Sequence, residues 1–197
     1  MDNIIQLPRH LPPVLHKKAA LMSFENCFKL GKIYKEVIGV GDFHHFSLNV
    51  VDENGEMSIL SYNPQIAFNI FKDGSYLYNG SISPTFYENK EMYTWDETYD
   101  PRYYHSLLNN MERKNGIKKG VVLTEKKEGK TLLFSFATKG NAESFIEDIS
   151  NNKSFYLSIG QHCYSLIKPI LDIYVGSTYD NNEKTRNTAQ IIKLQNK

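Results

Sequence analysis

The order of apolar and polar positions in the first third of the chain predicts a helix followed by a β-hairpin. Apolar residues between 18 and 38 recur at helical spacing. The side chains expected on the buried side of this helix are Leu21, Phe24, Phe28 and Ile33. Residues 43–51 alternate between polar and apolar, which is the period of a strand. An Asn-Gly turn then leads into a returning strand at residues 57–61.

The middle of the chain predicts two helices around an irregular, aromatic segment. Pro64 suits the first turn of a short helix, with Asn63 as its cap. Residues 75–98 show no clear period. The clearest helical pattern begins at Asp100, which we expect to be a cap. This helix is expected to close at Gly116, because glycine readily adopts the left-handed conformation common at helix ends.

The last third of the chain predicts a second hairpin and two more helices. Residues 119–124 and 131–137 read as strands joined by a charged turn that contains glycine. A helix is expected over 141–149, and a longer one from about Ser154. Pro169 should end or kink the longer helix, because proline removes a backbone donor and clashes with the preceding turn.

This order of elements predicts an α+β fold. The two hairpins are expected to pair into one antiparallel sheet of about five strands, flanked by helices on both faces as an α/β/α sandwich. Such a sheet leaves room for a pocket between its strands and one helical layer. We divide the chain into an N-terminal arm (1–17), one domain (18–175) and a polar C-terminal tail (176–197).

The composition of the chain excludes some classes of function but does not indicate a particular reaction. A chain of 197 residues with 41% hydrophobic and 23% charged residues is typical of a single globular domain. Its net charge of +1 provides no field that would select nucleic acid or an anionic membrane. The sequence shows neither a secretory signal nor an apolar run near the ~20 residues of a membrane span. We therefore expect a soluble cytoplasmic protein without direct contact to nucleic acid or membrane.

The residues that most often carry catalysis are not arranged for it. His44 and His45 are neighbours on a predicted strand and point to opposite faces. His162 and Cys163 are neighbours on a predicted helix, about 100° apart, which makes a poor catalytic pair. Cys27 and Cys163 are too far apart in sequence for a short metal-binding motif. We expect no enzyme activity, no metal site and no cofactor.

One segment resembles a known sensory family. Residues 115–138, NGIKKGVVLTEKKEGKTLLFSFAT, resemble the part of LuxR-family autoinducer-binding domains that reads GI-x-x-G, apolar strand, turn with glycine, apolar strand, S-x-A. The two glycines of that pattern are Gly116 and Gly120. Its closing serine and alanine are Ser135 and Ala137. The resemblance implies a PAS-like or GAF-like sensor domain.

Two further segments extend the resemblance to roughly residues 20–172. FHHFSLNVVDENGEMSILSYNP is similar to the first hairpin of that domain and its exit through an Asn-Pro step beside Tyr62. MYTW, which ends in Trp95, is similar to the aromatic F-x-W of the family. Family members bind N-acyl homoserine lactones between the sheet and a helical layer, so the resemblance implies a small-molecule site there.

The residues that hold the lactone head in the family are replaced here. The family's tryptophan falls on Ala67 and its tyrosine on Phe71, while its aspartate falls on Gly80 or, through a Ser-Pro step, on Ser83. Each hydrogen bond lost to a buried ligand group costs about 1–3 kcal/mol. An ordinary acyl homoserine lactone is therefore not the expected ligand. The candidate ligand-binding residues are Tyr62, Ala67, Phe71, Gly80, Ser83, Trp95 and Ser135.

The functional hypothesis is a sensory or regulatory domain similar to those of LuxR-type transcription regulators in bacterial quorum sensing. It would bind a small amphiphilic ligand, or pair with a related regulator as a homodimer or heterodimer. No helix-turn-helix pattern appears in the C-terminal segment, so a DNA-binding domain is not expected within this chain. The alternative hypothesis is a stand-alone protein-interaction domain, an effector or anti-activator, with a degenerate pocket.

Overall fold

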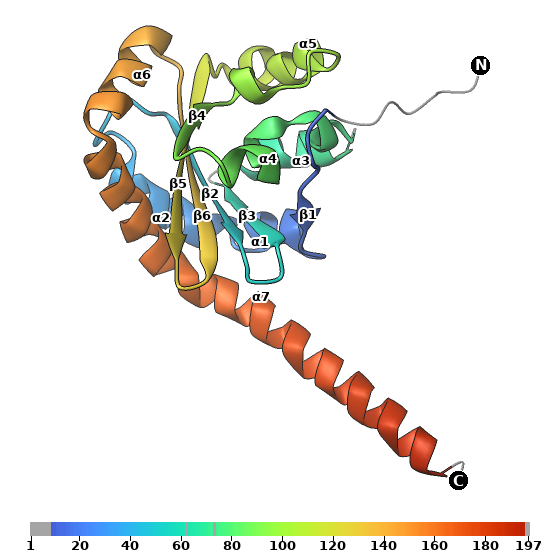
Figure 1. Cartoon of the computed structure of the whole chain (residues 1–197). Coiled ribbons are helices and arrows are strands. Elements are labelled where there is room, and N and C mark those ends of the chain that lie inside the picture. The colour runs from blue at the N-terminus through green and yellow to red at the C-terminus, as the bar shows by residue number, and fades with distance from the viewer. Residues whose placement is uncertain (1–8, 62, 73, 196–197) are drawn as a thin grey trace, which may run out of the picture.

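The computed structural model describes residues 9–61, 63–72 and 74–195, with side chains omitted at position 20 and over 175–195. These residues form one six-stranded sheet in the order β1-β3-β2-β6-β5-β4 (Figure 1). The two expected hairpins are confirmed, and they join through an antiparallel pairing of β2 with β6. The strands are β1 (Val14–Leu15), β2 (His45–Val51), β3 (Glu56–Ser61), β4 (Met92–Thr94), β5 (Lys119–Lys127) and β6 (Lys130–Thr138).

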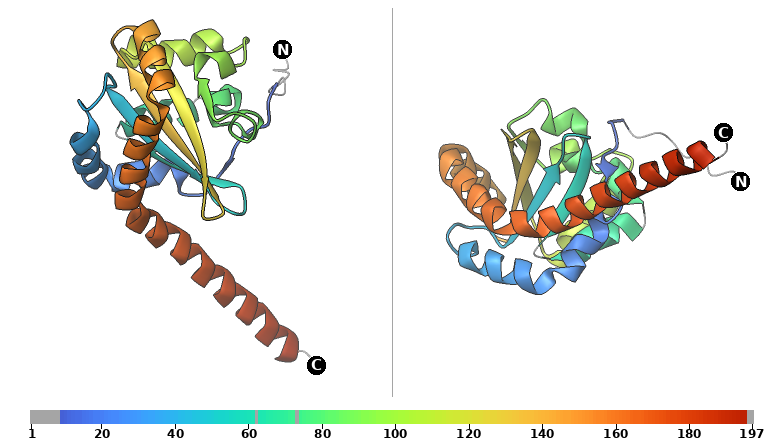
Figure 2. Two further views of the ribbon diagram at one scale, coloured as in Figure 1. Left: turned by 60° about the vertical axis from the view of Figure 1, so that its left-hand side comes forward. Right: turned by 90° about the horizontal axis from the view of Figure 1, so that it is seen from below.

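Helices cover both faces of the sheet, which confirms the expected α+β sandwich (Figure 1; Figure 2). One face carries α1 (Ala19–Glu25), α2 (Cys27–Val37), α6 (Ala142–Asn151) and α7 (Lys153–Gln195). The other face carries α3 (Pro64–Lys72), α4 (Pro84–Tyr87) and α5 (Tyr104–Leu108). Single turns complete this second layer, namely η1 (Ser75–Tyr78), η2 (Gly80–Ile82), η3 (Asp96–Thr98) and the π-helical η4 (Asn109–Arg113).

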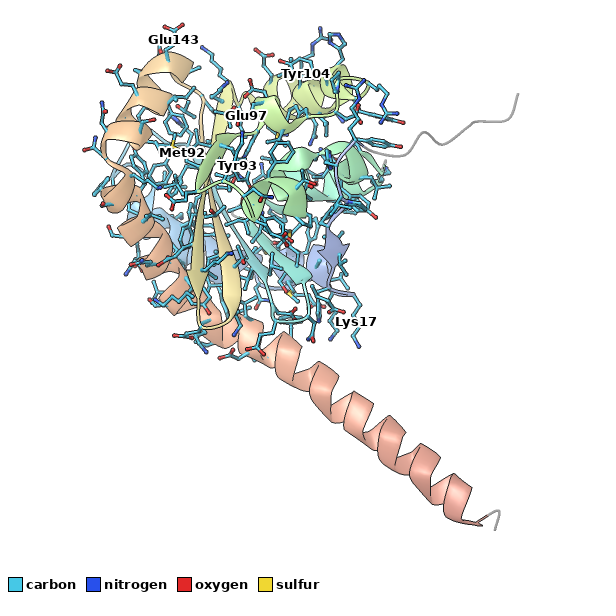
Figure 3. All side chains as sticks on the ribbon, in the orientation of Figure 1. Lys17, Met92, Tyr93, Glu97, Tyr104 and Glu143 are labelled. Atoms are coloured by element: carbon cyan, nitrogen blue, oxygen red, sulfur yellow. The ribbon has the colours of Figure 1, made fainter. Side chains whose placement is uncertain are left out.

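Alternation along the strands separates two cores, one on each face of the sheet. Phe46 and Phe136 lie in the core under α2 and α7, with ring centroids 4.9 Å apart. Met92 and Tyr93 are neighbours on β4 and point to opposite sides of the sheet (Figure 3). Every residue of β2 is buried, because this strand lies inside the sheet and is covered on both faces.

The expected orientation of the first helix is wrong for most of its apolar residues. The segment forms two helices that meet at Asn26, whose side-chain amide donates to the carbonyl of Met22. This break shifts the helical phase, so a single stripe cannot be extended across it. Leu21, Phe24 and Phe28 are 51%, 39% and 87% exposed. The buried side chains of this region are instead Met22, Leu30, Tyr34 and Val37.

The helix expected to start at Asp100 starts later. Its first regular turn begins at Tyr104, and Tyr103 occupies the N-cap position. The Asp100 carboxylate accepts the backbone N–H of Arg102 at 3.0 Å and also binds the Arg102 guanidinium, with Nη2 and Oδ2 2.6 Å apart. Asp100 therefore caps a turn that precedes the helix. The expected closure at Gly116 is confirmed, with φ at +69°.

The second hairpin is longer and tighter than its sequence suggests. The strands extend to Lys127 and from Lys130, leaving Glu128 and Gly129 as a two-residue turn. Both residues have positive φ, 52° and 74°, as the favoured two-residue hairpin turn requires. The charged residues before and after the turn belong to the strands, because half-exposed strand ends tolerate lysine and glutamate.

The terminal segments also differ from their sequence pattern. The arm packs on the domain: β1 pairs with β3 in parallel, and the Ser83 hydroxyl donates to the Leu11 carbonyl at 2.6 Å. Helix α7 does not end at Pro169, and its backbone continues through Gln195. The boundary proposed at residue 176 stays a prediction. Within the described residues, none of the helices is both long and apolar enough to cross a membrane.

Candidate ligand-binding cavity

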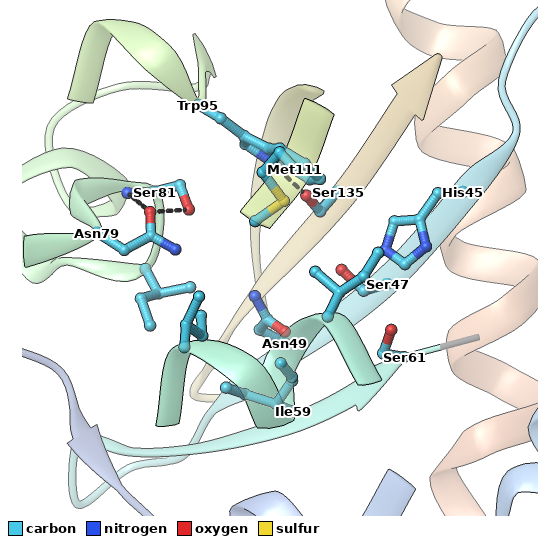
Figure 4. Close-up of a pocket in the computed structure, with 14 residues that line it drawn as sticks. His45, Ser47, Asn49, Ile59, Ser61, Asn79, Ser81, Trp95, Met111 and Ser135 are labelled. Atoms are coloured by element: carbon cyan, nitrogen blue, oxygen red, sulfur yellow. Dashed lines mark hydrogen bonds between the residues drawn. The ribbon is translucent and has the colours of Figure 1, made fainter. Parts of the chain in front are cut away.

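A cavity lies between the sheet and the helical layer formed by α3 and η2 (Figure 4). It has a volume of about 50 Å³. The residues that line it from the sheet are His45, Ser47, Asn49, Ile59, Ser61 and Ser135. The residues that line it from the other elements are Ile66, Ala67, Ile70, Asn79, Ser81, Ile82, Trp95 and Met111. The cavity therefore has a polar floor and a largely apolar roof.

Strand register produces the polar floor. Ser47 of β2 pairs with Ser61 of β3 on one side and with Ser135 of β6 on the other, so three hydroxyls lie side by side across three strands. His45 and Asn49 stand two residues before and after Ser47 and therefore share its face. All five side chains are buried. Burial of polar groups is unfavourable unless they find hydrogen-bond partners, so this row is the part of the sheet that we treat as a candidate site.

Helix α3 supplies the apolar roof and is fixed at several points. The Asn63 side chain accepts the Gln65 backbone N–H at 3.2 Å, which confirms the expected cap. Asn110 donates to the Ile66 carbonyl at 3.3 Å and accepts from the Asn69 side chain at 3.0 Å. The two bonds of Asn110 join the helix to η4.

Trp95, Ser135 and Gly120 form one structural unit in the cavity wall. The Trp95 indole N–H donates to the Ser135 hydroxyl at 2.8 Å, and the Trp95 backbone N–H donates to the Gly120 carbonyl at 2.9 Å (Figure 4). A Cβ atom at position 120 would lie 2.0 Å from Cδ2 of the indole ring. The ring can therefore reach the serine only across a glycine. Three residues from two sequence motifs are thus explained by one contact.

Two asparagines of the cavity differ in how their oxygens are satisfied. The Asn79 oxygen accepts the backbone N–H of Ser81 at 3.1 Å and its hydroxyl at 2.7 Å. Asn49 is 5% exposed, and its Oδ1 atom has no hydrogen-bond partner among the described residues. A buried carbonyl oxygen without a hydrogen-bond donor lowers the stability of the folded state. Asn49 is the described cavity residue whose buried oxygen lacks such a donor.

Among the described residues that line the cavity, His45 is the one titratable group. Burial lowers the pKa of His45 from 6.5 to about 4, and the nearby positive charge of Lys139 lowers it further in the same direction. The ring is therefore neutral at pH 7. It stands edge-on to the Trp95 ring, with centroids 6.3 Å apart. The cavity consequently presents no net charge from its described lining residues.

The lowered pKa of His45 makes stability depend on pH. Between pH 6.5 and about 4, His45 binds a proton in the unfolded chain but not in the folded protein. Acidification through this window therefore lowers the free energy of unfolding. The expected loss is on the order of 3 kcal/mol, and it levels off below about pH 4. Urea unfolding between pH 7 and 4 measures it, with His45→Gln as the control. Equal pH profiles for the variant and the wild type would contradict the prediction.

The structure brings three of the predicted site residues into the cavity. Ala67, Trp95 and Ser135 line it. Phe71 packs against Tyr76 instead, with ring centroids 5.3 Å apart, and is not among the lining residues. The ligand contacts of all these residues stay predictions.

The remaining predicted site residues lie elsewhere. Gly80 lies against Thr98, whose carbonyl oxygen would be 2.1 Å from a Cβ atom at this position. Ser83 is fully buried and holds the arm through Leu11. Tyr62 falls outside the described residues. The ligand-binding role assigned to these three positions is likewise untested.

Sequence reasoning selected Ser135 of the floor but not its other polar residues. The alternation of His45, Ser47 and Asn49 with apolar residues is visible in the sequence and is usually the mark of a strand with one solvated face. What the sequence does not reveal is that β2 lies inside the sheet, where its polar face must be covered. Asn79 and Ser81 come from the segment without a period, and no signal pointed to them.

Other polar surfaces of the domain offer less to a ligand. An open groove of about 500 Å³ near Lys90 and Lys153 contains both signs of charge, and Lys153 pairs with Glu91 at 2.5 Å. Such exposed pairs neutralise each other locally. Within the described part of the chain, no three His, Cys, Asp or Glu side chains gather closely enough to hold a metal ion.

Comparisons with known proteins give matches in structure but not in sequence. No family model and no curated protein matches the chain. The structure is similar to the N-acylhomoserine lactone dependent LuxR family transcription factor CepR2 from Burkholderia cenocepacia, with a TM-score of 0.52, 15% identity, and coverage of 77% of this chain and 98% of that chain.

Weaker matches are found to another protein, SdiA. Escherichia coli SdiA aligns with a TM-score of 0.49 and 11% identity over 78% of this chain and 68% of that chain. SdiA in complex with octanoyl-rac-glycerol aligns with a TM-score of 0.47 and 12% identity over 79% of this chain and 61% of that chain. The fold conclusion rests on the CepR2 match and on the sheet order described above. The chain has the fold of a LuxR-type autoinducer-binding domain.

Proposed function

We propose that this domain is a sensor that binds a small amphiphilic molecule in the cavity and transmits its presence to a regulatory partner. The observation that carries the proposal is the buried row of polar side chains across β3, β2 and β6 beneath an apolar helix. A polar floor and an apolar roof suit a ligand that has one polar and one apolar side. The shared fold with a lactone-dependent transcription factor supports a regulatory role.

The chemistry of the cavity favours binding over catalysis. A serine nucleophile needs a base within hydrogen-bond reach. Among the described residues, no hydrogen bond joins His45 to a serine of the cavity floor, and its low pKa makes it a weak base. Cys163 lies in the core on the opposite face of the sheet, where burial raises the pKa of its thiol to about 12. We therefore assign the cavity to the binding of a ligand that is released without chemical change.

The replaced head-group positions argue for a ligand other than an ordinary acyl homoserine lactone. Ala67 lines the cavity but offers no hydrogen bond, while Phe71 and Gly80 are engaged in packing away from it. The donors and acceptors available to a ligand lie instead on β2 and its neighbours. Recognition is thus shifted from the helical layer to the floor of the sheet.

Thermal unfolding in the presence of acyl lactones, fatty acids and small neutral amphiphiles tests the proposed function. A ligand at 100 times its dissociation constant stabilises the folded state by about 2.7 kcal/mol. We expect at least one class to raise the melting temperature of the wild-type domain in a saturable manner. A panel in which every class leaves the melting temperature unchanged would contradict the proposal.

A further inference from the structure

Exposed apolar side chains gather on the outer side of α1, α2 and α3. Phe28 is 87% exposed, and Leu21 and Phe24 on α1 are exposed as well. Phe68 of α3 is 40% exposed, and its ring stands edge-on to that of Phe24 with centroids 5.6 Å apart. Helices α1 and α2 lie at an outer edge of the molecule (Figure 2). We call these four residues the α1–α3 surface, which is too large to be a scatter of single apolar residues.

Helix α2 presents both an aromatic ring and positive charges to solvent. Leu30 and Tyr34 of this helix are fully buried. Phe28 lies two residues before Leu30, about 200° around the helix axis, and therefore points away from the sheet. Lys32 and Lys35 follow Phe28 by four and seven residues, so they share its outer side, and both are exposed. The phenyl ring and the two ammonium groups thus face solvent together.

The charges around this surface are strongly biased to one sign. Residues 17–36 contain five lysines, two glutamates and no arginine. Both glutamates are engaged with α7, because Glu25 accepts a hydrogen bond from Tyr174 and Glu36 lies 3.5 Å from the Nε2 atom of His162. Within the described residues, no ion pair is formed by the exposed lysines of this stretch, namely Lys17, Lys29, Lys32 and Lys35. The surface therefore has a local positive charge that the net charge of +1 conceals.

This combination of charge and apolar groups favours lipid over protein as the partner. Two copies that met through the same surface would bring their lysines face to face, which is unfavourable. Protein interfaces are enriched in arginine and depleted in lysine, whereas this stretch has lysine alone. Helices that lie on a membrane combine phenylalanine and leucine with lysine, and each lysine near an anionic leaflet adds to the attraction.

We propose that the α1–α3 surface binds the domain peripherally to an anionic lipid membrane. Leu21, Phe24 and Phe28 enter the headgroup region, and the surrounding lysines contact the lipid phosphates. The inference goes beyond the proposed sensor function and does not depend on a ligand in the cavity. It also replaces the expectation of no membrane contact, which came from the net charge of the whole chain and took no account of where the charges lie.

Flotation of the full chain with lipid vesicles tests the inference. We expect the chain to float with vesicles of phosphatidylcholine and phosphatidylglycerol, to stay behind with phosphatidylcholine alone, and to be released by added salt. Phe28→Ser should weaken the partitioning at least about tenfold, because the ring no longer enters the headgroup region. Lys32→Gln combined with Lys35→Gln should weaken it roughly 30-fold.

Matched controls separate this surface from the rest of the domain. Phe155→Ser removes a phenylalanine that is 43% exposed near the start of α7, outside the α1–α3 surface. Lys114→Gln combined with Lys118→Gln removes two exposed lysines that precede β5. Both control proteins should float as the wild type does. Thermal unfolding without vesicles establishes that every variant is folded.

Several results would overturn the inference. Absence of flotation with the mixed vesicles at low salt would leave the surface to an acidic protein. Equal binding to both vesicle types, or wild-type binding by either the Phe28 variant or the double lysine variant, would also contradict it. So would a dimer in sedimentation that Phe28→Ser converts to a monomer, because a second copy would then cover the surface. None of these results changes the outcome of the thermal-shift panel, which tests the sensor function separately.

Discussion

Gly120→Ala is expected to destabilise the domain by about 2–4 kcal/mol and to remove the Trp95–Ser135 hydrogen bond. The added methyl group would lie 2.0 Å from the indole ring, far inside van der Waals contact. Overpacking of a core costs about 1–3 kcal/mol, and the lost hydrogen bond adds about 1 kcal/mol. Chemical denaturation followed by Trp95 fluorescence measures both the stability and the environment of the ring.

Gly31→Ala provides the matched control for this substitution. Gly31 lies within α2, and a Cβ atom there would meet no atom within 4 Å. Alanine in a helix interior is better than glycine by about 1 kcal/mol, so this variant should be slightly more stable than the wild type. A Gly120→Ala protein as stable as Gly31→Ala would show that the tryptophan does not pack over this glycine.

Ala67→Phe is expected to abolish ligand binding while the domain stays folded. Ala67 is on the cavity side of α3, so a phenyl ring at this position would occupy the space available to a ligand. We expect the affinity for any ligand that stabilises the wild-type domain in the thermal-shift panel to fall more than about 100-fold, which corresponds to about 2.7 kcal/mol. Titration of the Trp95 indole resonance measures the loss.

The control for this substitution is Gln65→Phe on the same helix. Gln65 is exposed and bonds to Asn69 on the outer side of α3, so the same ring placed there should leave the affinity unchanged. Far-ultraviolet circular dichroism establishes that both variants are folded. An Ala67→Phe protein with wild-type affinity would place the ligand outside this cavity.

The sequence predicts most of the fold because its local signals are strong. The first hairpin follows from the alternation in residues 43–51 and its Asn-Gly turn. The end of the helix before β5 follows from Gly116, and the second hairpin from two apolar strands around a glycine. Each of these signals is read from residues that are close together in the sequence, namely a glycine that permits a positive φ or an alternation along one strand.

Several other local rules are overridden in the same sequence. The phase of α1 changes at Asn26 because its side chain bonds back to Met22, and a stripe drawn through Phe24 and Phe28 cannot anticipate that. Helix α5 starts only at Tyr104, and Asp100, which stands where a cap is expected, caps the preceding turn instead. Helix α7 continues past Pro169, where a local rule predicts an end or a kink.

The candidate site was partly predictable for a related reason. Trp95 and Ser135 belong to recognisable segments, and their contact across Gly120 explains why these residue types stand there. The polar floor depends on which strands neighbour β2, and that neighbourhood is a property of the whole sheet. Asn49 becomes a candidate only once its burial and its unpartnered oxygen are known.

The most direct measurement of the central claim is a fluorescence titration of Trp95 with acyl lactones, fatty acids and small neutral amphiphiles. Trp95 is the single tryptophan of the chain and lies in the cavity wall, so a bound ligand must change its surroundings. The account predicts a saturable change for at least one class, present in the wild type and in Gln65→Phe and absent in Ala67→Phe. No change with any class, or a change that persists in Ala67→Phe, would contradict it.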